Sequence, residues 1–252
     1  MSVISVYNIK GGVGKTAAAV NLAYLSSLDG ARTLLWDLDP QSSATFYLRV
    51  KPKIKGGSRA LIYDRKNIGA SIKGTDFENF DLLPGAFSHR KLDRLLLDSG
   101  NPVKGMSRLL KQLAGEYDQI FLDCSPGMTV LAEALFRVSD TVLAPTIPTT
   151  LSMRTLEQLR KYYGRKALDR SSVLGFFSMV DRRKKLHRSL CDSNTKKPFR
   201  FLKASIPFSS IVERMGLYRN PVCFYAASSK PSHAFKDLWE EIRGIEEKPP
   251  RN

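Results

Sequence analysis

The chain has 252 residues, of which 42% are hydrophobic and 25% are charged, an ordinary balance for a globular protein that excludes disorder as the default interpretation. Its 40 Lys and Arg residues outnumber its 24 Asp and Glu residues, and the resulting net charge of +16 predicts attraction to a polyanion, either nucleic acid or an anionic membrane surface. The three cysteines are far apart and lack C-x-x-C spacing, which argues against a disulfide framework or a zinc site and favours a reducing cytoplasm.

The first predicted elements form a β-α-β unit within forty residues. Residues 3–7 are a short apolar run that predicts a buried strand, and apolar residues at helical spacing predict a helix over residues 17–28. The run at residues 32–40 is apolar until its acidic end, which is typical of a strand buried on both faces of a parallel sheet. A glycine-rich loop joins the first strand to the helix.

Strand and helix patterns continue to alternate along the chain. Residues 50–74 are basic and contain glycines, which predicts a loop with a short helix. Further strands are expected at residues 80–85, 118–127, 141–145 and 172–180, and further helices at residues 104–117, 152–168 and 232–245. This alternation predicts an α/β fold with a doubly wound, mostly parallel sheet flanked by helices. We expect a single domain over residues 1–246, followed by a flexible tail at 247–252 whose paired prolines cannot continue a helix.

The loop has the composition of a phosphate-binding site. Gly11, Gly12 and Gly14 allow backbone N–H groups to point inward around phosphates, and the following helix presents its positive end to them. Lys15 is expected to reach the β and γ phosphates, and Thr16 to place its hydroxyl on Mg²⁺. The alternative, a chance glycine-rich turn, is disfavoured by the strand before the loop and the helix after it.

The segment KGGVGKT resembles the deviant Walker A loop of the ParA/MinD family of P-loop ATPases. The resemblance implies a P-loop NTPase fold, ATP and Mg²⁺ as cofactors, and nucleotide contacts from Lys10, Gly11, Gly12, Val13, Gly14, Lys15, Thr16 and Ala17. In that family the extra lysine, here Lys10, reaches the nucleotide held by the other subunit of an ATP-bound homodimer. It would place positive charge where negative charge develops, as an arginine finger does.

Three later segments extend the resemblance. WDLDPQSSAT is similar to the family's switch segment, which implies that Asp39 positions the attacking water and joins Lys10 and Lys15 as a catalytic residue. DQIFLDCSPG is similar to the second acidic motif, which gives Thr16, Asp39 and Asp123 as the residues around the metal. Taken singly, either aspartate could be a helix cap or a turn residue. SIPFSSIVERMG resembles the stretch whose proline, here Pro207, lies near the adenine.

Family branches differ in what their members bind. MinD-like members attach to membranes through a basic amphipathic C-terminal helix, and the acidic segment DLWEEIRGIEEKPPRN argues against a membrane partner. Nitrogenase-reductase relatives hold an iron–sulfur cluster through cysteines, but Cys124 has no evident second ligand and is expected to be a core residue. Members that repress operons carry an extra N-terminal DNA-reading domain, and because this chain starts at its first strand we do not expect sequence-specific operator binding.

Positive charge is concentrated between residues 154 and 203, where 15 Lys and Arg residues face four acids. The centre of this segment, DRRKKLHR, supplies the candidate DNA-binding residues Arg182, Arg183, Lys184, Lys185 and Arg188. Because no recognition helix or zinc module is predicted there, it suits non-specific contact with DNA phosphates. The alternatives are a solvated face, or residues that hold the dimer or contact nucleotide.

Together these features predict a ParA-like Mg-ATPase, cytoplasmic and nucleoid-associated. The ATP-bound homodimer would bind non-specific DNA, and a ParB-like or other cargo-associated activator would trigger slow hydrolysis and release, which would partition or position a plasmid, a chromosome or another cargo. Two alternatives stay open: a metabolic or metal-centre-assembly P-loop enzyme, and a membrane-associated MinD-like positioning ATPase. The enzyme alternative explains the loop and the aspartates but not the basic segment.

Overall fold

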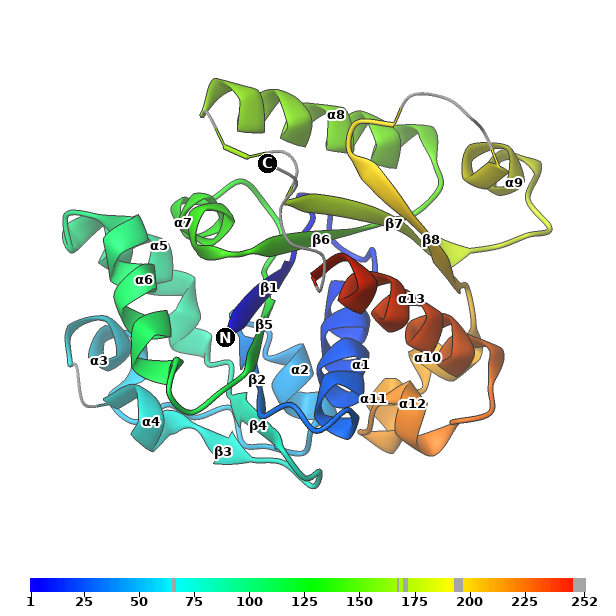
Figure 1. The fold of residues 1–252 in the computed structure, drawn as a ribbon. Helices are drawn as coiled ribbons and strands as arrows, with labels where there is room; N and C mark the ends of the chain where they lie inside the picture. The colour runs from blue at the N-terminus through cyan, green and yellow to red at the C-terminus, as the bar shows by residue number, and fades with distance from the viewer. Residues whose placement is uncertain (65–66, 167, 170–171, 193–196, 247–252) are drawn as a thin grey trace.

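A computed structural model describes residues 1–64, 67–166, 168–169, 172–192 and 197–246 (Figure 1). Within them, eight strands form one sheet in the order β3-β4-β2-β5-β1-β6-β7-β8, parallel except for the antiparallel pair of β3 and β4. The strands are β1 (Ser2–Val6), β2 (Thr33–Asp37), β3 (Lys73–Gly74), β4 (Phe80–Leu83), β5 (Gln119–Asp123), β6 (Thr141–Thr146), β7 (Val173–Val180) and β8 (Arg200–Pro207). The predicted α/β fold, with its doubly wound, mostly parallel sheet in a single domain, is confirmed. The predicted tail at 247–252 lies outside the described residues.

Helices cover both faces of this sheet (Figure 1). The N-terminal half contributes α1 (Lys15–Leu28), α2 (Ser43–Tyr47), α3 (Gly57–Tyr63), α4 (Asn67–Ser71), the 3₁₀ helix η1 (Phe87–Lys91), α5 (Leu92–Asp98) and α6 (Pro102–Leu113). The C-terminal half contributes α7 (Val130–Val138), α8 (Thr150–Arg165), α9 (Lys185–Asp192), α10 (Ser210–Glu213), α11 (Met215–Tyr218), α12 (Val222–Tyr225) and α13 (Lys230–Glu246). In the described residues, no helix is long and apolar enough to span a membrane.

Two hydrophobic clusters, one on each face, hold the layers together. Successive strand residues point to opposite faces, so Leu34 and Trp36 of β2 join one cluster while Leu35 joins the other. The first cluster packs the sheet against α3, α5, α6, α7 and α8, and the second packs it against α1, α2, α11, α12 and α13. Burial on both faces explains why the central strands are almost continuously apolar.

Strand register brings two acids together at the carboxyl edge of the sheet. β2 and β5 pair in parallel, so that Asp37 lies directly opposite Asp123 at the ends of the two strands. β1 also pairs with β5, with Val6 opposite Asp123, and the glycine-rich loop leaves β1 two residues later. The loop and both acids therefore occupy the same edge, where parallel α/β sheets bind ligands.

The far edge of the sheet is closed by an acidic side chain. Among the described strands the outer strand β8 pairs with β7 alone, and where that pairing shifts register its Lys203 and Ala204 N–H groups donate to the carboxylate of Glu241 on α13, at 2.8 to 3.0 Å. Two N–H groups of this strand thus find an acceptor within the same chain.

The buried His89, just before α5, makes the free energy of unfolding depend on pH. The Ala86 N–H donates to Nδ1 of His89 at 2.8 Å, and burial lowers the pKa of His89 to about 4, against roughly 6.5 in an unfolded chain. Between these values the unfolded state binds more protons, so stability is complete above about pH 6.5 and falls as the pH drops towards 4. Between pH 7 and pH 5 we expect the free energy of unfolding to fall by about 2 kcal/mol through this residue.

Urea denaturation at both pH values would measure this contribution. His89→Asn keeps an acceptor near Ala86 and should show a smaller fall with pH than the wild type. His233→Asn, at an exposed histidine, is the matched control and should keep the wild-type dependence. An unchanged pH dependence in His89→Asn would assign the effect to other groups.

Candidate functional site

The glycine-rich loop is shaped by two left-handed glycines. Gly12 and Gly14 have φ values of +69° and +89°, which favour glycine, and Gly14 immediately precedes α1. A Cβ atom at Gly14 would lie 2.9 Å from Oγ of Ser178 on β7, so the loop also packs tightly against that strand. Asn8 anchors the start of the loop, because its Oδ1 accepts from the Lys10 N–H at 2.9 Å and its Nδ2 donates to the Pro145 carbonyl at 2.8 Å.

Lys15 curls back inside this loop. Its Nζ donates to the Lys10 carbonyl at 3.1 Å, and the residue is only 8% exposed. Burial lowers the pKa of Lys15, whereas the nearby carboxylates of Asp123 and Asp39 act in the opposite sense. A cation held in a cradle of backbone N–H groups is suited to binding phosphate oxygens.

Asp123 is a buried acid without a hydrogen-bond donor. It is 1% exposed, and neither carboxylate oxygen has a partner among the described residues, although Thr16 lies close enough to favour its ionised form. Burial, followed by the charge of Asp37, raises the pKa of Asp123 well above its usual value. Two unsatisfied oxygens beside a threonine hydroxyl fit a hard divalent cation such as Mg²⁺, which prefers oxygen ligands.

Asp37 and Asp39 connect the end of β2 to α2. Oδ2 of Asp37 accepts from the backbone N–H and the hydroxyl of Thr45, at 2.9 and 2.7 Å, and its Oδ1 accepts from the Asp39 N–H at 3.2 Å. Burial raises the pKa of Asp37 to about 6, and its hydrogen bonds oppose that shift. Asp39 accepts from the Gln41 N–H at 2.9 Å and borders the cavity described next.

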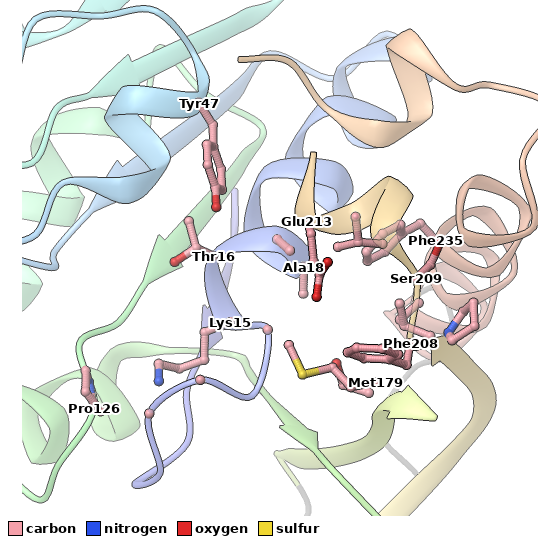
Figure 2. A pocket seen from close by; sticks show the side chains of 18 of the residues that line it. Lys15, Thr16, Ala18, Tyr47, Pro126, Met179, Phe208, Ser209, Glu213 and Phe235 are labelled. Atoms are coloured by element: carbon pink, nitrogen blue, oxygen red, sulfur yellow. The ribbon is translucent and has the colours of Figure 1, made fainter. Parts of the chain in front are cut away.

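A cavity of about 360 Å³ runs from the glycine-rich loop to the segment that follows β8 (Figure 2). Figure 2 shows Lys15 on the loop side and Phe208, Ser209 and Phe235 gathered on the other side. The loop end is basic and rich in N–H groups, whereas the far end is largely apolar. This is the polarity that a nucleotide requires of its phosphate and base subsites.

Most of the predicted nucleotide-binding residues line this cavity, together with the predicted catalytic and metal residue Asp39: Gly11, Gly12, Gly14, Lys15, Thr16, Ala17 and Pro207. Val13 and Asp123 are buried and do not line the cavity. Lys10 is half-buried and does not line the cavity of its own chain. Sequence reasoning missed the lining residues Tyr47, Ser178 and Met179, which no local motif marks. It also missed Phe208, Ser209 and Glu213, because only Pro207 was singled out of the segment SIPFSSIVERMG.

The basic segment begins where the cavity wall ends. Ser178 and Met179 line the cavity, and the candidate DNA-binding residues follow β7 directly. The segment is helical from Lys185, since α9 starts there, which the sequence analysis did not predict. Within DRRKKLHR, residues 181–188, His187 is the one buried side chain, and its Nδ1 accepts from the Asp181 N–H at 3.0 Å, which holds the start of α9 against the end of β7.

The exposed cations of this segment are not equivalent. Arg183 pairs with Asp181 at 2.9 Å, and Arg182 pairs with Asp192 at 3.3 Å. Lys184, Lys185 and Arg188 are exposed and form no ion pair with any described residue, although Nη1 of Arg188 donates to the Arg182 carbonyl at 3.2 Å. These three side chains therefore carry positive charge that no described carboxylate neutralises and that is available to an external anion.

A strand, a glycine-rich loop, a helix and a buried acid on the neighbouring strand together define the class of P-loop nucleotide-binding proteins. A family model described as an AAA domain matches residues 1–170. The sporulation initiation inhibitor protein Soj of Bacillus subtilis is 27% identical over 95% of this chain and 97% of its own length. The chromosome partitioning protein ParA of Myxococcus xanthus is 33% identical over 62% of this chain and 56% of its own. The chain belongs to the ParA/MinD family of P-loop ATPases, as the loop and the acidic motifs predicted.

A solved structure of a synthase has the same fold. Cobyrinic acid a,c-diamide synthase from Mycobacterium smegmatis, with a bound ATP analogue and magnesium, superposes with a TM-score of 0.83 over 98% of this chain and 96% of that one, at 24% identity. The likeness extends through the whole sheet. A fold shared with a biosynthetic enzyme does not distinguish a molecular switch from a metabolic catalyst, so function must be argued from the site.

Proposed function

We propose that this protein is an ATP-dependent dimerising ATPase that binds DNA non-specifically and, through partner-stimulated hydrolysis, partitions or positions a plasmid, a chromosome or another cargo. One observation carries the proposal: the strand that packs against the phosphate loop, at Ser178 and Gly14, continues without a break into the basic segment. A change at the nucleotide can thus reach the proposed DNA surface through a connection of only a few residues.

The chain's own groups suit ATP with Mg²⁺. Lys15 and the loop N–H groups would hold the phosphates, and Thr16, Asp39 and Asp123 would surround the cation. Mg²⁺ would neutralise charge that develops on the phosphate oxygens. Asp39, half-buried at the cavity wall and held by the Gln41 N–H, would orient the attacking water. Pro207 and the apolar residues around it would receive the adenine.

Lys10 favours a dimer. Its backbone is fixed by Asn8, yet its side chain does not line the cavity of its own chain, whereas Lys15 does. In an ATP-bound homodimer that closes at the carboxyl edge of the sheet, Lys10 would reach the partner's nucleotide. Doubling the basic segments would also multiply the contacts with DNA, so binding would depend on ATP.

The cellular role follows from the relatives named as a chromosome partitioning protein and as Soj. A ParB-like or other cargo-associated protein would act as the activator, and the protein would be cytoplasmic and associated with the nucleoid. The second candidate is a metabolic P-loop enzyme, since cobyrinic acid a,c-diamide synthase shares the fold. The enzyme alternative assigns no role to Lys184 and Lys185, which form no ion pair with any described residue.

Binding to non-specific duplex DNA tests the proposal. We expect tight, salt-sensitive binding only with a slowly hydrolysed ATP analogue, and weak binding with ADP or without nucleotide. The slope of log K against log salt concentration should be about −0.9 for each phosphate neutralised. Equal binding in all three nucleotide states, or none in any of them, would contradict the proposal and favour the enzyme alternative.

The two free lysines sharpen this test. Lys184→Ala with Lys185→Ala should weaken DNA binding and reduce the magnitude of the salt slope by about 2 per chain, while basal hydrolysis stays unchanged. The matched control is Lys104→Ala with Lys111→Ala, two exposed lysines on α6, away from β7. If both double variants weakened binding equally, the effect would come from net charge and not from the basic segment.

A further inference from the structure

Tyr47, the last residue of α2, points into the nucleotide cavity. It lines that cavity together with Thr16, Ala17 and Asp39. It also lines a second hollow of about 800 Å³ between α2 and α11, so its half-buried side chain forms part of the wall between the two hollows. Figure 2 shows the side chain reaching from α2 towards Thr16 with its hydroxyl oxygen leading, on the side of the cavity away from Phe208.

The hydroxyl of Tyr47 forms no hydrogen bond with any described residue. The nearby Tyr225 differs, because its hydroxyl donates to the Ile211 carbonyl. Burial, followed by the charge of Asp123, raises the pKa of Tyr47, so the hydroxyl keeps its proton at neutral pH. A phenol that keeps its proton and has no acceptor in the described protein is available to donate to a ligand in the cavity.

The surroundings of this hydroxyl correspond to the phosphate end of the cavity. Thr16, towards which it points, is the second residue of α1, and the N-terminus of a helix favours negative charge. Phe208 and Phe235, which suit a base, lie on the other side of the cavity (Figure 2). A phosphate loop holds the α and β phosphates at the start of its helix. These phosphates, which ADP and ATP share, are therefore the part of the ligand nearest to the Tyr47 hydroxyl.

Contacts with α11 and the residue after it fix the position of the Tyr47 ring. A Cβ atom at Gly216 would lie 3.7 Å from Cε1 of Tyr47, so the ring packs close to the backbone of α11. One residue before Tyr47, the Phe46 carbonyl accepts from Nε of Arg219 at 3.0 Å, and the Arg219 guanidinium lies 4.6 Å from the Phe46 ring centroid. A donor that is held in place before the ligand arrives loses little conformational freedom on binding.

α2 also joins Tyr47 to the switch segment. Thr45 donates its N–H and its hydroxyl to Oδ2 of Asp37, and the same hydroxyl accepts from the Gly85 N–H at 2.7 Å. Asp37 in turn accepts from the Asp39 N–H. A ligand that holds the Tyr47 hydroxyl would therefore restrain α2 and, through Thr45 and Asp37, the residue proposed to orient water.

We propose that the Tyr47 hydroxyl donates directly to a phosphate oxygen that ADP and ATP share, and that Tyr47 thereby holds α2 in place when nucleotide is bound. A hydrogen bond from a hydroxyl to an ionised phosphate is shorter and stronger than one between neutral groups. The inference deepens the proposed function, since it rests on ATP as the ligand of this cavity. It adds a nucleotide contact from outside the glycine-rich loop and places it on the helix in which the switch segment ends.

Tyr47→Phe tests the contact, because it removes the hydroxyl and keeps the ring. Isothermal titration calorimetry should show that the affinities for ADP and for a slowly hydrolysed ATP analogue both fall by about tenfold or more. The loss for ADP should persist in EDTA, since the contact is direct. Tyr218→Phe is the matched control, because it removes the hydroxyl of an exposed tyrosine on α11 that does not line the cavity. Its affinities should stay within about twofold of the wild type, and both variants should keep the wild-type urea midpoint.

Hydrogen–deuterium exchange at saturating ADP measures the restraint of α2 independently of affinity. The amides of α2 should exchange more slowly with ADP than without it in the wild type and in Tyr218→Phe. In Tyr47→Phe, ADP should slow them little. Equal slowing in the wild type and Tyr47→Phe, or no slowing in either, would overturn the link between the nucleotide and α2.

The calorimetric outcomes separate this inference from the proposed function. Equal nucleotide affinity in the wild type and Tyr47→Phe would overturn the inference and leave the proposed function standing. A loss confined to the ATP analogue would overturn it by placing the hydroxyl at the γ phosphate. A loss confined to buffer with Mg²⁺ would overturn the direct contact and assign the hydroxyl to a water molecule bound to the metal. Wild-type protein that bound neither nucleotide would contradict the proposed function and the inference together.

Discussion

Replacing Lys15 with alanine is expected to abolish nucleotide binding. Lys15 is the buried cation of the phosphate loop, and among the described residues its Nζ has the Lys10 carbonyl as its one acceptor, at 3.1 Å, which leaves its other protons for phosphate oxygens. Removing one partner of a buried charge pair costs about 2–5 kcal/mol, so the affinity for ATP should fall by about a hundredfold or more. Titration with a fluorescent ATP analogue would measure it.

Lys10→Ala is the matched control for this variant, because it removes a lysine from the same loop whose side chain does not line the cavity. Its affinity for ATP as a monomer should stay within about threefold of the wild type, because screened charges outside a site contribute little. Equal loss of affinity in both variants would show that Lys10 serves the nucleotide of its own subunit.

The second large effect is expected in the assembly of Lys10→Ala. If Lys10 completes the partner's site, the variant should bind ATP and remain monomeric, and its DNA binding should fall to the level of the nucleotide-free protein. The loss follows because two basic segments in one dimer bind together far more tightly than either does alone. Light scattering after size-exclusion chromatography with a slowly hydrolysed ATP analogue would give the mass.

Two controls make this result interpretable. Lys53→Ala removes one exposed lysine outside both hollows and should dimerise as the wild type does. Circular dichroism should show that Lys10→Ala is folded, since the anchoring hydrogen bond to Asn8 uses the backbone N–H of Lys10 and survives the substitution. A normal ATP dimer formed by Lys10→Ala would refute the proposed role across the interface.

The central strands and the phosphate loop could be predicted because their signals are local. The five residues of β1 end at Val6, and Gly12 and Gly14, which have positive φ, follow within eight residues, so both features can be found in one short stretch of sequence. β8 was not predicted, since an outer strand with alternating exposure, which contains Lys203, lacks the continuous apolar run of a buried strand. α7 was also missed, although Thr129 caps it by accepting from the Ala132 N–H at 3.1 Å.

Much of the cavity wall could not be predicted for a different reason. Tyr47 lies more than a hundred residues before Met179 and Glu213 in the chain, and the strand order brings the three residues to one wall. The contribution of Asp37 likewise depends on its register with Asp123 and on the hydroxyl of Thr45. Local sequence patterns identify the chemistry of the phosphates, whereas the base subsite and the switch network arise from topology.

The two outer strands, β3 and β8, offer few free backbone groups for pairing with a strand of a neighbouring molecule. At one side of the sheet β3 has only two residues, and at the other side Glu241 occupies the N–H groups of Lys203 and Ala204. Strand addition from a neighbouring molecule, the usual route to fibrous aggregation, is therefore disfavoured at both sides. Copies of this chain at high local concentration are thereby left to associate through surfaces other than the two outer strands.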